Sequence, residues 1–187
     1  MLVIDWPHFL KDGLQQGEKL SSMTIGVFDG VHRGHQRLIE RIVSHNTAYT
    51  PAVITFRQNH KKNEKMPDIQ TFPQKTEALE RLGVKITVVI DFTEAFRRMA
   101  GIEFFEILHK RGNIGFFAVG SAFRCGHRLD TDAAAIKNFF ISRSIPVEII
   151  PEVLEGSLPI SSSRIRSAIE SGDLSLAEKM LGRPLST

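Results

Sequence analysis

Residues 23–35 read M-T-I-G-V-F-D-G-V-H-R-G-H, an apolar run that passes into a loop rich in glycine and histidine. The apolar run 23–28 predicts a buried strand, and the apolar spacing of residues 34–44 predicts a helix. The glycine-rich loop between them would lie at the carboxyl end of the strand. There, the N-terminus of the following helix presents N–H groups and a partial positive charge to anions. The stretch therefore predicts a phosphate-binding loop in an α/β protein.

The rest of the chain repeats the order of strand and then helix. The predicted strands and helices are 52–56 and 74–82, then 84–90 and 103–110, then 114–119 and 132–142, and finally a strand at 147–150. Continuous apolar strands that alternate with helices are typical of parallel sheets covered on both faces. The pattern predicts a doubly wound parallel sheet.

The C-terminal part predicts two short helices. Residues 160–174 read I-S-S-S-R-I-R-S-A-I-E-S-G-D-L, which opens a helix with serine caps and closes it at Gly172. Asp173 would cap a second helix that runs to Leu181. We expect one domain over residues 1–187 with a short C-terminal helical extension.

Two segments carry side chains suited to phosphate. His32 and His35 are three residues apart, so both can project from one helical turn toward one anion. The loop has neither the lysine of a Walker A motif nor the dinucleotide fingerprint. Ser161 to Ser163 offer hydroxyls and N–H groups at a helix start, and Arg164 and Arg166 offer guanidinium forks. A triphosphate between two helix N-termini is one interpretation; a glycine-rich turn and a capped helix with exposed arginines are the other.

Composition narrows the class of protein. Hydrophobic residues make up 42% of the 187 residues and charged residues 24%, which is typical of a globular protein. The net charge of +3 comes from 24 basic and 21 acidic residues in mixed order, so no nucleic-acid partner is expected. Cys125 is the only cysteine, the N-terminus does not resemble a signal peptide, and no apolar run approaches a membrane span. We expect a cytoplasmic protein; the sequence does not set its oligomeric state.

The same two segments resemble a known family. Residues 24–39, T-I-G-V-F-D-G-V-H-R-G-H-Q-R-L-I, closely resemble the G-x-F-D-G-x-H-x-G-H-Q signature of bacterial FAD synthetases, an adenylyltransferase module usually fused to riboflavin kinase. Residues 160–166 resemble the family's I-S-S-T-x-I-R. Residues 172–184 resemble the segment that leads into the kinase, and no kinase domain is expected in this chain. The resemblance implies the Rossmann-like fold of the H-x-G-H nucleotidyltransferases.

The resemblance also implies a reaction and its residues. The phosphate of FMN would attack the α-phosphorus of ATP with Mg²⁺ present, giving FAD and pyrophosphate without a covalent enzyme intermediate. The implied catalytic residues are His32, His35 and Arg166. The implied ATP-binding residues are Gly26, Val27, Phe28, Asp29, Gly30, Gly34, Ser161, Ser162, Ser163 and Arg166. The implied flavin-binding residues are Asn59, Gly120, Ala122, Phe123 and Arg124, and no side-chain metal ligands are expected.

The chain departs from the family pattern in two segments. Where the family has T-F-x-P-H-P, residues 55–60 read T-F-R-Q-N-H, so Asn59 replaces histidine. Where the family has G-x-[DN]-F-R-[FY]-G, residues 120–126 read G-S-A-F-R-C-G, with Ala122 and Cys125 at the changed positions. Two alternatives stay open: a non-catalytic flavin- or nucleotide-binding protein, and a nucleotidyltransferase for another phosphorylated small molecule.

Two further expectations concern a loop and the aromatic residues. Residues 57–73 are polar and show no periodicity, and long loops of this kind are often mobile lids. Six phenylalanines that occur as three adjacent pairs are expected in the core rather than around a flavin. They are Phe104, Phe105, Phe116, Phe117, Phe139 and Phe140.

Overall fold

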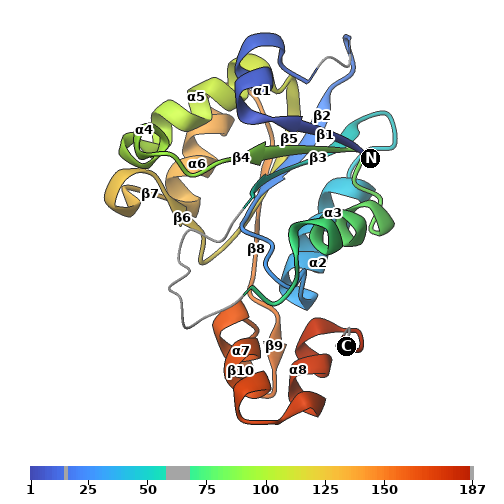
Figure 1. The fold of residues 1–187 in the computed structure, drawn as a ribbon. Helices are drawn as coiled ribbons and strands as arrows, with labels where there is room; N and C mark the ends of the chain where they lie inside the picture. The colour runs from blue at the N-terminus through green and yellow to red at the C-terminus, as the bar shows by residue number, and fades with distance from the viewer. Residues whose placement is uncertain (15–16, 58–67, 186–187) are drawn as a thin grey trace.

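The fold is a single parallel sheet covered by helices on both faces. The computed structural model describes residues 1–14, 17–57 and 68–185 (Figure 1). The six-stranded sheet has the strand order β1-β4-β3-β2-β5-β8, and every neighbouring pair in it is parallel. Its strands are β1 (Leu2–Asp5), β2 (Ser21–Ile25), β3 (Thr50–Phe56), β4 (Ile86–Ile90), β5 (Ile114–Gly120) and β8 (Val147–Ile150). The predicted doubly wound α/β class is confirmed.

Each predicted helix is present, and the structure adds elements that the pattern did not predict. The helices are α1 (Trp6–Asp12), α2 (Arg33–Ser44), α3 (Phe72–Arg81), α4 (Glu94–Arg98), α5 (Gly101–Arg111), α6 (Ala133–Ile141), α7 (Ser162–Glu170) and α8 (Leu174–Leu181). A short 3-10 helix follows at His127–Leu129, and two small hairpins pair β6 (Arg124–Cys125) with β7 (Thr131–Asp132) and β9 (Leu154–Glu155) with β10 (Leu158–Pro159). Three of these elements were not predicted: strand β1, at the sheet edge, and helices α1 and α4. Their apolar runs are too short to stand out.

The predicted strand 23–28 is wrong at its end. Strand β2 stops at Ile25, and Phe28 has a φ of 53°, outside the extended region. The Phe28 side chain is nonetheless fully buried, so the apolar pattern continued past the strand into the loop. The helix begins at Arg33, one residue before the predicted start.

The two faces of the sheet bury different helices. Helices α1, α5 and α6 pack on one face, and α2 and α3 pack on the other (Figure 1). Neighbouring residues of a strand point to opposite faces, so Phe117 joins the first layer while Phe116 joins the second. The expectation that the six phenylalanines belong to the core is confirmed, although Phe104 also borders a cavity.

The two C-terminal helices form a small unit of their own beyond the end of β8 (Figure 1). Ser161 caps α7 by accepting from the N–H of Arg164, and Asp173 caps α8 by accepting from that of Leu176. Their apolar faces pack on each other around Ile165 and Met180. The predicted helical extension and its caps are confirmed.

The loop expectation is tested only in part. Residues 58–67, which include Asn59, lie outside the described residues, so the predicted lid stays a prediction. The loop ends earlier than predicted, because α3 begins at Phe72, capped by Thr71 and Gln74 in a reciprocal capping box. Within the described ranges, no helix is long and apolar enough to cross a membrane.

Candidate functional site

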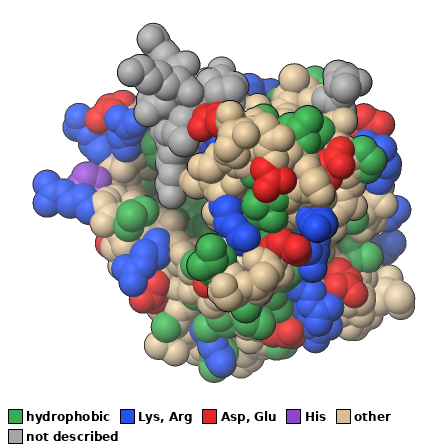
Figure 2. Space-filling model, turned by 90° about the horizontal axis from the view of Figure 1, so that it is seen from below, with side chains coloured by type: hydrophobic (Ala, Val, Ile, Leu, Met, Phe, Trp, Pro, Cys, Tyr) green, Lys and Arg blue, Asp and Glu red, His purple; other side chains and the backbone are tan. Residues whose placement is uncertain are grey.

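A cavity of about 570 Å³ opens at the carboxyl ends of the strands. Strands β2 and β5 are neighbours at the centre of the sheet, and their following loops run to opposite sides, which is where open α/β sheets bind ligands. Seen from the side of α7 and α8, the molecular surface is hollowed, with hydrophobic side chains at the floor (Figure 2). The two ends of this cavity differ in chemistry: one is polar and the other is aromatic.

The first end is lined by the loop between β2 and α2 and by the start of α7. The lining residues here are Gly26, Val27, Asp29, His32, His35, Ser161, Ser162, Ser163 and Arg166. The structure thus brings together two segments about 130 residues apart, as the sequence predicted for a triphosphate site. Phe28, Gly30 and Gly34 lie behind this lining. A Cβ on Gly34 would approach the His32 ring to 3.2 Å, so a side chain there would crowd the imidazole.

The two histidines form a stacked pair. Their ring centroids are 3.6 Å apart with an interplanar angle of 18°, and His32 Nδ1 accepts from the N–H of His35 as the cap of α2. Burial lowers the pKa of His32 to about 4. Burial, with the nearby His32 and Lys75, lowers the pKa of His35 well below its ordinary value. Both imidazoles are therefore neutral at pH 7, and His35 Nδ1 has no hydrogen-bond partner among the described residues.

A buried ion pair joins the two segments. Asp29 and Arg166 are 4% and 8% exposed, and their side chains are in direct contact. The Asp29 carboxylate also accepts from the N–H of Ile69 at 2.9 Å, and its backbone carbonyl accepts from Ser162 Oγ at 2.9 Å. Burial raises the pKa of Asp29 although Arg166 acts to lower it. The positive charge of Arg166 offsets the negative charge of the Asp29 carboxylate, which would otherwise repel phosphate.

The two arginines of the S-S-S-R-I-R segment have different surroundings. Arg166 lines the cavity, whereas the Arg164 guanidinium donates to the carbonyls of Glu155, Leu158 and Pro159 at 2.8 to 3.2 Å. The prediction that Arg164 offers a fork to phosphate is therefore wrong. Its donors hold the β9–β10 hairpin against α7.

A buried lysine beside the loop was missed. Lys75 of α3 is 5% exposed, and its ammonium donates to the carbonyls of Val27 at 3.1 Å and Phe56 at 2.8 Å. Burial lowers its pKa to about 8, with Asp29 and Asp68 acting in the opposite direction. Its sequence surroundings, P-Q-K-T-E, are polar and typical of an exposed helix face, so the sequence held no signal for it.

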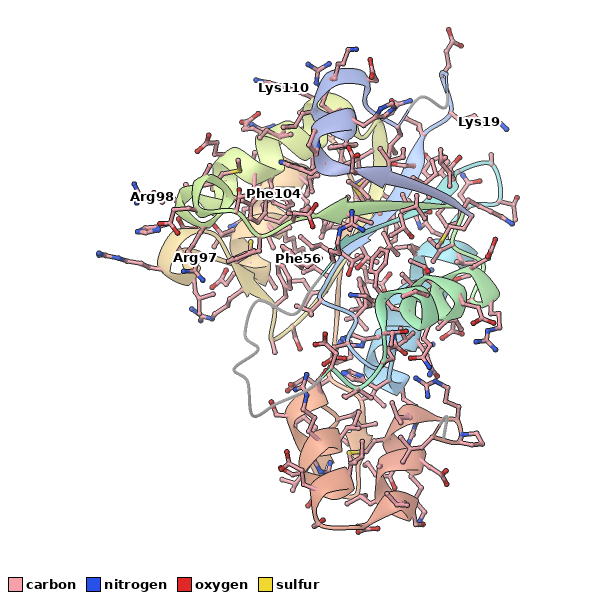
Figure 3. All side chains as sticks on the ribbon, viewed as in Figure 1. Lys19, Phe56, Arg97, Arg98, Phe104 and Lys110 are labelled. Carbon is pink, nitrogen blue, oxygen red and sulfur yellow. The ribbon has the colours of Figure 1, made fainter. Side chains whose placement is uncertain are left out.

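The second end of the cavity is aromatic. It is lined by Phe56 from β3, Phe92 and Phe96 from the β4–α4 region, Phe104 from α5 and Phe123 after β5. The centroid of Phe96 lies 5.6 to 5.9 Å from those of Phe56, Phe92 and Phe104, with edge-to-face angles. Phe56 and Phe104 lie between the end of the sheet and helices α4 and α5, and Arg98 points outward (Figure 3). Phe123 was among the predicted flavin-binding residues and Phe104 was expected in the core rather than around a flavin, whereas Phe56, Phe92 and Phe96 were not predicted.

The segment after β5 contributes the remaining predicted flavin-binding residues. Gly120, Ala122, Phe123 and Arg124 all line the cavity, and so does Cys125. Burial raises the pKa of the Cys125 thiol to about 12, with Asp130 adding to the effect, so the thiol stays protonated. The two changed positions therefore present small apolar groups to the aromatic end.

The acidic and metal-ligating side chains of the described cavity lining, among them Asp29, His32 and His35, do not form a cluster of three. Within residues 1–14, 17–57 and 68–185, no three His, Cys, Asp or Glu side chains lie close enough together to hold a metal ion.

The fold and the site define a Rossmann-like domain of the nucleotidyltransferase type, with paired histidines at a helix start beside a central strand. The family model of FAD synthetases matches residues 14–164. The chain belongs to the FAD synthetase family.

Curated relatives agree with this assignment. The chain is 30% identical over 177 residues to the bifunctional riboflavin kinase/FMN adenylyltransferase of Buchnera aphidicola subsp. Schizaphis graminum, covering 89% of this chain and 56% of that protein. The protein of the same description from Bacillus subtilis is 27% identical over 188 residues, covering 97% and 58%. The chain thus spans less than two thirds of the length of these relatives.

Solved structures show the same fold. A structure described as a macrolide-efflux protein from Streptococcus pneumoniae has a TM-score of 0.86 and 28% identity, covering 99% of this chain and 61% of that one. Pantoate-beta-alanine ligase from Francisella tularensis, complexed with beta-gamma ATP and beta-alanine, has a TM-score of 0.60 at 16% identity, covering 97% and 78%. At that identity the second likeness concerns the fold alone.

Proposed function

We propose that the chain is an FMN adenylyltransferase that transfers AMP from ATP to FMN and releases pyrophosphate. One observation carries this: a single cavity joins the two-histidine loop to a compartment of phenylalanines. The first end suits a triphosphate and the second suits a flat heteroaromatic ring, which phenylalanine side chains contact edge-on or by stacking. Membership in the FAD synthetase family supports the same pair of substrates.

In this proposal the triphosphate lies between the starts of α2 and α7. The free N–H groups of both first helical turns, that of Ser162 among them, and the hydroxyls of Ser161 and Ser163 bind phosphate oxygens, while the Ser162 hydroxyl keeps its bond to the Asp29 carbonyl. Neutral His32 and His35 each donate one N–H toward the α-phosphate, and the anion in turn raises their pKa values. Arg166 holds Asp29 neutralised and faces the departing pyrophosphate. Mg²⁺ bound to the ATP phosphates would supply neutralisation of their charge.

The flavin lies at the aromatic end with its phosphate directed toward the histidines. An oxygen of the FMN phosphate forms the new bond to the α-phosphorus, and the bond from that phosphorus to the bridging oxygen of pyrophosphate breaks. The attacking group is already an anion, so no general base is required. The protein supplies alignment and stabilisation of charge.

Incubation with ATP, Mg²⁺ and FMN tests the proposal. We expect stoichiometric FAD and pyrophosphate, measured by chromatography and by a coupled pyrophosphate assay. Tight binding of both substrates without product at high protein concentration would instead indicate a binding protein. Product formed only with another phosphorylated acceptor, such as phosphopantetheine or nicotinamide mononucleotide, would replace FMN in the proposal.

A further inference from the structure

The backbone of the phosphate loop is held by side chains from outside it. Five consecutive carbonyls, those of residues 27–31, each accept a hydrogen bond from a side chain that lies elsewhere in the chain. The donors to Val27, Phe28, Asp29, Gly30 and Val31 are, in order, Lys75 with Thr55, Gln70, Ser162, Arg183 and Gln36, at 2.9 to 3.4 Å.

The carbonyls that these side chains bind belong to a segment with an unusual backbone conformation. Phe28, Gly30 and Val31 have φ values of 53°, 83° and 39°. A positive φ is costly for a β-branched residue such as Val31 and persists only where the surroundings fix it. In a trans peptide the next N–H points opposite to the carbonyl. Side chains that hold the carbonyls of this loop therefore also set the direction of its N–H groups, which are its donors to an anion.

The donor to Gly30 lies in the C-terminal tail, residues 182–185, which follow α8. Arg183 follows α8, and its guanidinium donates to the Gly30 carbonyl at 3.0 Å and to Gln70 Oε1 at 2.9 Å. Gln70 itself donates to the Phe28 carbonyl, so Arg183 supports two loop positions, one directly and one through Gln70. The end of α8 also packs on the loop, because a Cβ on Gly30 would lie 3.3 Å from the Leu181 side chain.

The start of α2 is hydrogen-bonded to the end of α8. Gln36 donates to the Leu181 carbonyl at 2.8 Å as well as to the Val31 carbonyl at 2.9 Å. Arg33 pairs with Glu155 at 2.5 Å and donates to the Lys179 carbonyl at 3.3 Å. The loop and the end of α8 are thus joined by several independent bonds, and Arg183 is the one that reaches the middle of the loop.

We propose that Arg183 is a positioning residue for nucleotide binding, which fixes Gly30 so that the loop N–H groups and His32 face the triphosphate. The C-terminal tail would then contribute to nucleotide binding by positioning the loop. This inference rests on the proposed function for its kinetic readout, but not for its binding readout. Arg183 does not line the cavity, so its effect passes through the loop.

The decisive variant is Arg183→Gln, with Arg143→Gln as its matched control. Like Arg183, Arg143 donates to a backbone carbonyl, that of Phe139 at 2.9 Å, and to one side chain on another element, which is Glu106 here and Gln70 for Arg183. Arg143 lies on α6's side of the sheet, away from the loop. Three quantities are measured in both variants: affinity for the non-hydrolysable α,β-methylene ATP, affinity for FMN, and melting temperature. Arg183→Lys, which can keep one of the two bonds, serves as the conservative variant.

For Arg183→Gln we expect nucleotide affinity, and kcat/KM for ATP, to fall about tenfold to a hundredfold, as misplacement of binding groups does. FMN affinity stays at the wild-type value, the melting temperature stays close to that of Arg143→Gln, and Arg183→Lys recovers part of the loss. Equal nucleotide affinity in wild type and Arg183→Gln overturns the inference, as does a parallel loss of nucleotide and FMN binding. Wild-type protein that binds the nucleotide analogue but forms no FAD contradicts the proposed function and leaves the binding comparison valid.

Discussion

The two ends of the cavity are built in opposite ways. At the phosphate end, polar side chains and a buried ion pair fix a strained backbone, and the groups that face the ligand come from two short segments. At the aromatic end, the apolar rings of five phenylalanines from separate parts of the chain provide the wall. Directional bonds enforce one geometry, whereas apolar packing tolerates repacking. The difference predicts a rigid, selective nucleotide end and a more adaptable acceptor end.

Breaking the ion pair should have the largest effect. Arg166→Met leaves the Asp29 carboxylate buried without its guanidinium, and we expect the free energy of unfolding to fall by about 3–5 kcal/mol. Urea denaturation measures it. Arg97→Met is the control at the aromatic end, where the arginine is exposed and a change below about 0.5 kcal/mol is expected. Equal effects of the two variants would refute the contrast in rigidity.

Removing one imidazole should chiefly affect turnover. His35→Ala takes away a donor aimed at the α-phosphate, and we expect kcat for FAD formation to fall about 10²- to 10³-fold with FMN affinity unchanged. His45→Ala is a matched control, because His45 caps the C-terminal end of α2, where its ring stacks on Phe116 with a centroid separation of 3.7 Å, and it does not line the cavity. A His35→Ala enzyme with near wild-type kcat would exclude this role.

Opening the aromatic wall should affect only the acceptor. Phe96 contacts three other rings of the wall, and Phe96→Ala removes the central edge-to-face partner. We expect FMN to bind roughly tenfold more weakly, by fluorescence titration, because one aromatic contact contributes about 0.5–1.5 kcal/mol beyond its buried area. Binding of α,β-methylene ATP should not change. If both ligands weaken together, the two ends are not separable.

The smallest effect concerns Lys75, whose ammonium bonds one carbonyl at each end of the cavity. Its pKa of about 8 in the folded protein lies below the ordinary 10.5, so between these values the folded state binds fewer protons than the unfolded chain. Stability therefore rises with pH across this window. From pH 7 to pH 9 the wild type should gain about 1 kcal/mol relative to Lys75→Met, measured by urea denaturation at each pH. A difference that is constant with pH would argue against the lowered pKa.

The sequence predicted more of the phosphate end of the cavity than of the aromatic end, where only the segment after β5 was named, and the reason is physical. His32, His35 and Ser161 to Arg166 lie in two contiguous segments whose helix starts fix their geometry locally, so their placement could be predicted. Phe56, Phe92 and Phe96 meet only because β3 and β4 are neighbours in the sheet, and no local pattern encodes that contact.

Local patterns also failed wherever the partner of a side chain decides its role. Arg164 and Arg166 are alike in sequence, yet one guanidinium turns to the backbone of the β9–β10 hairpin and the other to Asp29. Lys75 lies in a polar stretch but is buried under the loop. The strand 23–28 was predicted too long because Phe28 is as buried as a strand residue while its backbone has already turned.

The bond from Arg183 to Gly30 joins positions 153 residues apart, and this separation has a consequence for the order of folding. Strands β1 to β5 and their helices can pair while the chain is still being synthesised, since domains form progressively as sequence emerges. The loop that follows β2 is then present but lacks two of its carbonyl partners, Ser162 and Arg183. A nascent chain would acquire its sheet early and its full affinity for nucleotide only as α7 and α8 dock against the loop.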